Sequence, residues 1–161
     1  MNRIPIETLA IAFVAGCAFY NPGSVPLGTP LGAVRESLGA PVARFALPRD
    51  GQRLEYARGA SGRETYMLDF DAQGLLVASE QVRTEANFAT ITPGLGRDEL
   101  LLRMGHPSTV FAVPRQHLWV WNYHFFTGDC RWFQVSVSHT GSVLDASIGR
   151  DPECDYPEPR N

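Results

Sequence analysis

The sequence predicts an α+β fold of two tandem units, each a short helix followed by an antiparallel meander of strands. Three observations lead to this prediction: an internal repeat, apolar residues at helical spacing that end at a glycine, and alternating apolar residues bounded by turn residues. The chain has 161 residues, is 44% hydrophobic and carries a net charge of -3, which is typical of a folded protein and not of a disordered one. We expect the first unit at 26–83 and the second at 92–150.

The internal repeat is found when the chain is shifted by 66 residues. Segment 38–41 (Leu-Gly-Ala-Pro) then falls on 104–107 (Met-Gly-His-Pro), and segment 45–49 (Phe-Ala-Leu-Pro-Arg) falls on 111–115 (Phe-Ala-Val-Pro-Arg). After one inserted residue, a shift of 67 matches Leu54, Tyr56, Tyr66, Leu68, Phe70 and Gly74 with Trp121, Tyr123, Phe133, Val135, Val137 and Gly141. The preserved order of these matches indicates two copies of one unit.

Each expected unit begins with a helix. Leu31, Val34 and Leu38 recur at helical spacing, Gly39 stands at a C-terminal cap position and Pro41 follows it. The second unit repeats this order with Leu100, Leu101, Met104, Gly105 and Pro107. The expected strands are 52–58, 63–71 and 75–83, then 117–126, 130–139 and 142–148, with a short connecting helix in 84–91.

The strand register follows if the hairpin of the second unit turns around Gly128. Trp121 then faces Val135 and Tyr123 faces Phe133, which makes one face of the sheet apolar, as a core requires. The stripe of Trp119, Trp121, Tyr123 and Phe125 is therefore expected in the core.

The opposite face of that hairpin is the candidate protein-binding surface. Its members are Val120, His124, Phe126 and Trp132, rimmed by Asn122 and Gln134. An exposed apolar group with a polar rim is typical of a protein contact. The alternative is that the N-terminal linker or the other unit covers this face.

The first residues of the chain predict a lipid anchor. Residues 1–16 are mostly apolar and end in Val14-Ala15-Gly16, directly before Cys17. This resembles a bacterial lipobox, in which a signal peptide is removed and the cysteine is acylated. Residues 17–25 would then be a linker, and Ala18 after the cysteine favours sorting to the outer membrane. The alternative is an apolar segment that is retained and packs on the domain.

The other two cysteines, Cys130 and Cys154, form an even pair that an oxidising compartment would join. The hairpin register places position 151 opposite Cys130, so Cys154 could fold back to it and fix the tail at 151–161. Two reduced, buried cysteines are the alternative.

The pattern resembles the SmpA/OmlA (BamE-like) family of outer-membrane lipoproteins. The resemblance rests on Gly28, Val34, Tyr56 and segment 38–41, and again on Gly94, Leu100, Tyr123 and segment 104–107. It implies a tandem form of an accessory lipoprotein of the machine that folds barrels into the outer membrane. A tandem arrangement of such units is also similar to the beta-lactamase-inhibitory protein fold.

Little in the sequence points to catalysis. It contains no phosphate loop, dinucleotide fingerprint or nucleophile elbow, and acidic residues outnumber scattered arginines, which disfavours a nucleic-acid binder. His117 and His139 face one another in the register, but two ligands do not make a zinc site. Asp69 is expected to be solvent-exposed and Asp71 to lie in a turn. We expect no catalytic residue, no metal and no cofactor.

These observations together predict a non-enzymatic lipoprotein on the periplasmic face of the outer membrane. Its partner would be another envelope protein, such as a barrel-assembly component, and its role would be outer-membrane protein assembly or envelope integrity. The alternative function is a periplasmic inhibitor or binding protein of the beta-lactamase-inhibitor type, with no assembly role.

Overall fold

The computed structural model describes residues 20–126 and 131–152. Its α-helices are α1 (Leu31–Leu38), α2 (Glu85–Phe88) and α3 (Arg97–Met104), and three-residue 3-10 helices lie at Pro22–Ser24, Ala60–Gly62 and Pro114–Gln116. Its strands are β1 (Ala43–Ala46), β2 (Gln52–Arg58), β3 (Glu64–Phe70), β4 (Leu76–Gln81), β5 (Thr109–Val113), β6 (Leu118–His124), β7 (Arg131–Ser138) and β8 (Val143–Arg150). The strands form two four-stranded antiparallel sheets, sheet 1 in the order β1-β2-β3-β4 and sheet 2 in the order β5-β6-β7-β8.

The expected α+β class with two helix-plus-meander units is wrong, because the fold is mainly β. Strands account for 44% of the described residues and helices for 23%. The two longest α-helices in the described ranges have only eight residues each. The sequence prediction also missed one edge strand in each sheet, β1 and β5. Both are short, with four and five residues, and proline follows each of them closely, at Pro48 and Pro114, so no long run of alternating residues marks them.

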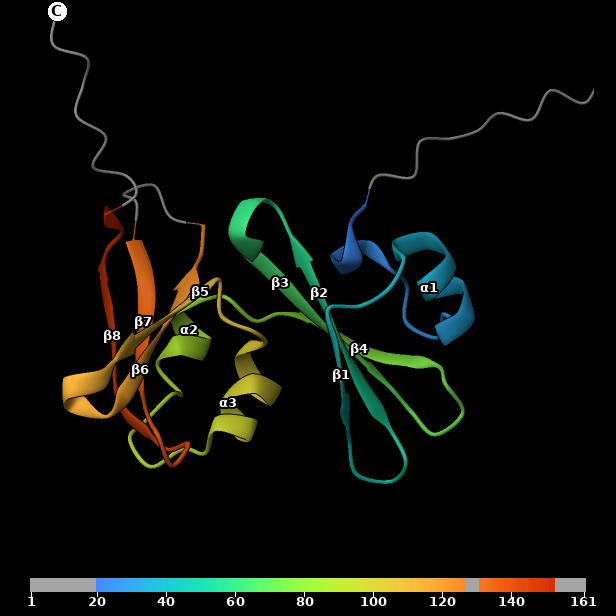
Figure 1. The fold of residues 1–161 in the computed structure, drawn as a ribbon. Coiled ribbons are helices and arrows are strands. Elements are labelled where there is room, and N and C mark those ends of the chain that lie inside the picture. Colours follow the sequence, from blue (N-terminus) through green and yellow to red (C-terminus); the bar gives the residue numbers. More distant parts are fainter. Residues whose placement is uncertain (1–19, 127–130, 153–161) are drawn as a thin grey trace, which may run out of the picture.

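The molecule is layered (Figure 1). Sheet 2 lies at one end, α2 and α3 lie between the two sheets, and α1 covers the far side of sheet 1. One core contains Val34, Leu54, Tyr56, Leu68, Phe70 and Leu76. The other contains Phe88, Ile91, Leu100, Met104, Tyr123, Phe125, Phe133, Val135, Val137 and Val143. Helix α3 therefore contributes to the core of sheet 2 while its other side faces sheet 1.

Backbone hydrogen bonds recur at the shifts found in the sequence. Gly28 N donates to Leu76 O at 2.7 Å, and Gly94 N donates to Val143 O at 2.8 Å. The phenol of Tyr56 donates to Gly39 O, and that of Tyr123 donates to Gly105 O. Gly39 and Gly105 have φ of 80° and 72°, which favours glycine at both helix ends. Positions related by these shifts are called counterparts below.

The predicted register of the second hairpin is confirmed. Trp119 pairs with Val137, Trp121 with Val135, Tyr123 with Phe133 and His124 with Trp132. The expectation that the whole aromatic stripe lies in the core is only partly met. Tyr123 and Phe125 are buried, whereas Trp119, the second residue of β6, is 41% exposed.

Within residues 20–126 and 131–152, no helix is long and apolar enough to span a bilayer.

Candidate functional site

The residues of the predicted protein-binding surface lie together on sheet 2. The register places Val120, His124 and Trp132 on one face of the sheet, opposite the face that carries Tyr123 and Phe133. We call this the outer face of sheet 2. Phe126 follows β6 and is 82% exposed.

Two polar members of the outer face are not exposed, contrary to expectation. Asn122 is fully buried, since its amide donates to Thr109 Oγ1 at 3.0 Å and accepts from Gln134 Nε2 at 2.8 Å. His124 is 2% exposed and contacts the ring of Trp132 edge-on, with ring centroids 6.0 Å apart. Its Nδ1 lies 3.2 Å from Oδ2 of the buried Asp151, a contact without hydrogen-bond geometry. His124 therefore offers no contact area to a partner.

The counterpart face of sheet 1 is covered by the second half of the chain. Arg53 on this face makes two hydrogen bonds to Asp69, at 2.6 and 2.7 Å, and donates to Leu102 O of α3 at 3.0 Å. The pairing with Arg53 leaves Asp69 largely buried, so the expectation that it is exposed is wrong. We call this contact between sheet 1 and the second half the seam.

Phe45 and Phe111 show how the two faces differ. Phe45 lies at the seam, with its ring 6.4 Å from that of His106. Phe111, its counterpart on β5, pairs with Val120 on the outer face of sheet 2 and is 54% exposed. Phe45 thus contacts the second half of the chain, whereas Phe111 at the counterpart position is exposed.

Two buried charges hold the seam together, and the sequence analysis missed both. Glu55 is 1% exposed and accepts the backbone N–H of His106. Arg83 is 4% exposed and donates to the carbonyls of Ser61, His106 and His124. Burial lowers the pKa of Arg83 to about 10. Both residues act through partners far along the chain, so no local motif identifies them.

A second candidate site is a groove on the inner face of sheet 2, near the start of β6. Its volume is about 290 Å³. It is lined by Arg97, Val110, Trp119, Trp121, Val137, Ser138, His139 and Gly141. The ring of Trp119 stacks on His139 with centroids 5.8 Å apart, and His139 contacts His117 edge-on. We call this the aromatic groove.

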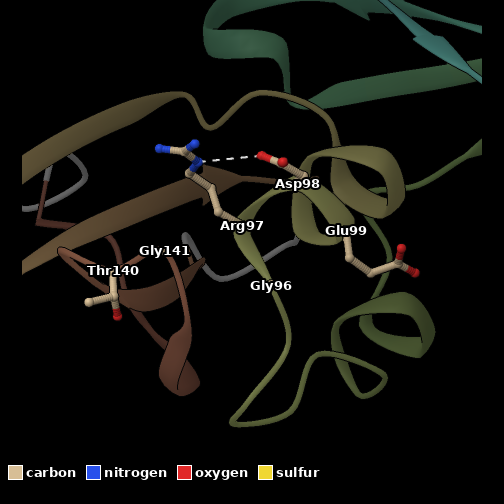
Figure 2. A pocket seen from close by; sticks show the side chains of 6 residues that line it. All are labelled: Gly96, Arg97, Asp98, Glu99, Thr140 and Gly141. Carbon is tan, nitrogen blue, oxygen red and sulfur yellow. Dashed lines mark ion pairs between the residues drawn. The ribbon is translucent and has the colours of Figure 1, made fainter.

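A shallower hollow adjoins the aromatic groove on the other side of Arg97 (Figure 2). It has a volume of about 220 Å³ and is lined by Gly96, Arg97, Asp98, Glu99, Thr140 and Gly141. The Nε atom of Arg97 lies 3.5 Å from Oδ1 of Asp98. Arg97 and Gly141 border both spaces, so Arg97 separates an apolar space from an acidic one.

The structure brings no metal site together. Among residues 20–126 and 131–152, no group of three His, Cys, Asp or Glu side chains could hold an ion. Asp71 accepts hydrogen bonds from the backbone N–H groups of Gln73 and Leu75, as turn chemistry requires. Cys17, Cys130 and Cys154 lie outside the described residues, so acylation and the disulfide stay predictions.

Comparison with known proteins adds little. No family model matches the chain, and no curated protein matches it. Among solved structures, the chain is similar to a DUF4309 family protein (YjgB) from Bacillus subtilis, with 13% identity and a TM-score of 0.30, covering 76% of this chain and 79% of that one.

Proposed function

We propose that the protein is a non-enzymatic outer-membrane lipoprotein, anchored through Cys17, that binds another envelope protein on the periplasmic side. Its role would be to support outer-membrane protein assembly or envelope integrity. The lipobox-like segment before Cys17 and the resemblance to SmpA/OmlA lipoproteins support the location.

The exposure of Phe111 carries the binding part of the proposal. Phe45, its counterpart, packs at the seam, whereas Phe111 is 54% exposed. Val120 pairs with Phe111 on the same face, and exposed Phe126 follows the same strand. Aromatic residues are enriched in protein interfaces and carry much of their binding energy. We therefore assign the partner to the outer face of sheet 2, with Phe111 as its centre.

Photocrosslinking in intact cells tests this assignment. A photoreactive residue would replace Phe111, and in a matched chain it would replace Val77, which is 51% exposed on β4 of sheet 1. We expect the Phe111 position to capture a barrel-assembly component and the Val77 position not to capture it. Equal capture at both positions would reject the surface. Capture of a soluble secreted enzyme instead would reject the assembly role and favour an inhibitor.

Membrane fractionation tests the anchor separately. Cys17→Ser should remove acylation and move the protein from the membrane to the soluble fraction. If the wild-type chain retains residues 1–16 and is itself soluble, the anchor is wrong, whatever the crosslinking shows.

A further inference from the structure

The aromatic groove lies where several counterpart residues differ between the two halves of the chain, and the first of them stands at the start of a helix. Leu31 is the first residue of α1, and its backbone N–H donates to Gly74 O at 2.8 Å. Arg97 is its counterpart at the start of α3 and donates to Gly141 O at 2.7 Å. Leu31 packs against the core of sheet 1. Arg97 has a side chain that is 57% exposed, so it leaves the end of its sheet uncovered.

The uncovered end of sheet 2 is apolar. Trp119 is 41% exposed and Val110 is 46% exposed, and both border the groove. Their counterparts in sheet 1 are Gln52 and Arg44, which are polar. The second half therefore has apolar side chains around this space. It also has Arg97 at the position where Leu31 packs on the core of the first half. Stacking on His139 holds the ring of Trp119 in place.

The guanidinium of Arg97 has hydrogen-bond donors that are available to a ligand. Its Nε lies 3.5 Å from Oδ1 of Asp98, the contact that Figure 2 marks. Within the described parts of the chain, the ion pair with Asp98 is the one polar side-chain contact of Arg97, and neither terminal nitrogen donates a hydrogen bond. A guanidinium presents a planar pair of donors that fits a carboxylate. Asp98 and Glu99 stand on the other side of Arg97 and would repel a ligand of higher negative charge.

We propose that the aromatic groove binds a small aryl carboxylate. The flat apolar group would lie against Trp119 and Trp121, where the first half places a leucine side chain, and the carboxylate would pair with Arg97. A volume of about 290 Å³ suits a single ring with a short chain. The groove lies on the opposite face of sheet 2 from Phe111, so this inference does not depend on the proposed protein partner.

Titration of the full chain with 4-phenylbutyrate tests the proposal by NMR. The chain has three tryptophans, which give three indole N–H signals that single Trp→Phe variants assign. Trp132 lies on the outer face and serves as the internal control. We expect the signals of Trp119 and Trp121 to shift in a saturable way while that of Trp132 stays fixed. No shift at millimolar ligand, or an equal shift of all three signals, would overturn the proposal.

The charge requirement is tested with a neutral ligand and two arginine variants. We expect 4-phenylbutyramide to bind about fivefold more weakly than the acid, and Arg97→Gln to remove this difference. Arg103→Gln on the same helix is the matched control, because Arg103 is paired with Glu99 outside the groove. Equal binding of acid and amide to the wild type would overturn the role of Arg97. The peptide Ala-Ala-Phe ends in an aromatic residue with a free carboxylate. If it bound more tightly than phenylbutyrate, the ligand would be the C-terminus of a peptide and the proposal of a small molecule would be rejected.

Discussion

The buried carboxylate of Glu55 holds His106 at two points across the seam. One oxygen accepts the backbone N–H of His106 at 2.9 Å, and the other lies 2.8 Å from its Nδ1. Glu55 lies on β2 and His106 lies two residues after the end of α3, so this pair joins sheet 1 to the second half of the chain. The imidazole is half exposed, whereas the carboxylate is not.

Glu55→Ala should lower the free energy of unfolding by about 2–3 kcal/mol, since it removes two charge-assisted hydrogen bonds and leaves a cavity. His106→Ala should cost only about 1 kcal/mol, because the backbone N–H still donates and the lost imidazole is half exposed. Urea unfolding of both variants measures the difference. Equal losses would show that the backbone bond contributes little.

Gly105→Ala and Gly39→Ala form a matched pair. Both glycines have a positive φ, so alanine is strained at either position, at a cost of about 1–3 kcal/mol. A Cβ at Gly39 would meet no atom within 4 Å, whereas one at Gly105 would lie 2.7 Å from Oε1 of Glu55. Gly105→Ala should therefore be less stable than Gly39→Ala by at least about 1 kcal/mol. Identical melting temperatures would mean that Glu55 is free to move aside.

Arg83→Met should destabilise the protein by about 3 kcal/mol, since three carbonyl groups would each lose a donor. The expected fall in Tm is on the order of 10 °C for a chain of this length. Calorimetry gives the result, and Arg115→Met, at an exposed position, is the control. A change of under about 0.5 kcal/mol would show that other contacts hold the seam.

Because the phenol of Tyr123 is buried, we expect the protein to lose stability in alkaline solution. Burial raises its pKa above the value of 10.0 that it has in an unfolded chain. Its contribution is therefore complete below pH 10 and is lost as pH rises from there toward the pKa of the folded state, by about 1.4 kcal/mol per pH unit. The lowered pKa of Arg83 has the opposite effect on stability. Above about pH 10 the folded state gives up this proton before the unfolded state does, so this group adds stability as pH rises.

Tyr123→Phe should be about 1 kcal/mol less stable than the wild type at pH 8, because it lacks the hydrogen bond to Gly105 O. This deficit should shrink or reverse by pH 11, since phenylalanine does not titrate. Urea midpoints at both pH values test the crossing. A deficit that stays constant would contradict the assignment.

The repeat and the hairpin register could be predicted from the sequence because both depend on local periodicity. Alternating apolar residues around Trp121 and Val135 can face a core in only one register, since a slip of one residue would expose them. Gly39 and Gly105 similarly mark both helix ends. The strands β1 and β5 lack such alternation and lie at sheet edges, so the sequence did not distinguish them from loops.

The seam could not be predicted, because its residues resemble ordinary surface residues in the sequence. Arg83 and His124 are 41 positions apart, and Glu55 and His106 are 51 apart. Their burial depends on how the two halves of the chain meet, which local periodicity does not encode. Asn122 and His124, expected at an exposed surface, are buried instead by neighbours within the second half, Gln134 and Thr109 around Asn122 and Trp132 and Asp151 around His124.

The position of α3 between the sheets has a consequence for biosynthesis. The chain is made from its N-terminus, so residues up to about 83 emerge before α3 does, and the emerging first half presents Glu55 and Arg53 to water with neither Leu102 nor His106 in place. These charged groups keep the uncovered face of sheet 1 soluble until the second half arrives. A fragment truncated before α3 would retain that charged face without Leu102 and His106 to accept and donate its hydrogen bonds. The first half of the protein therefore gains these partners only from the second half, which is translated later.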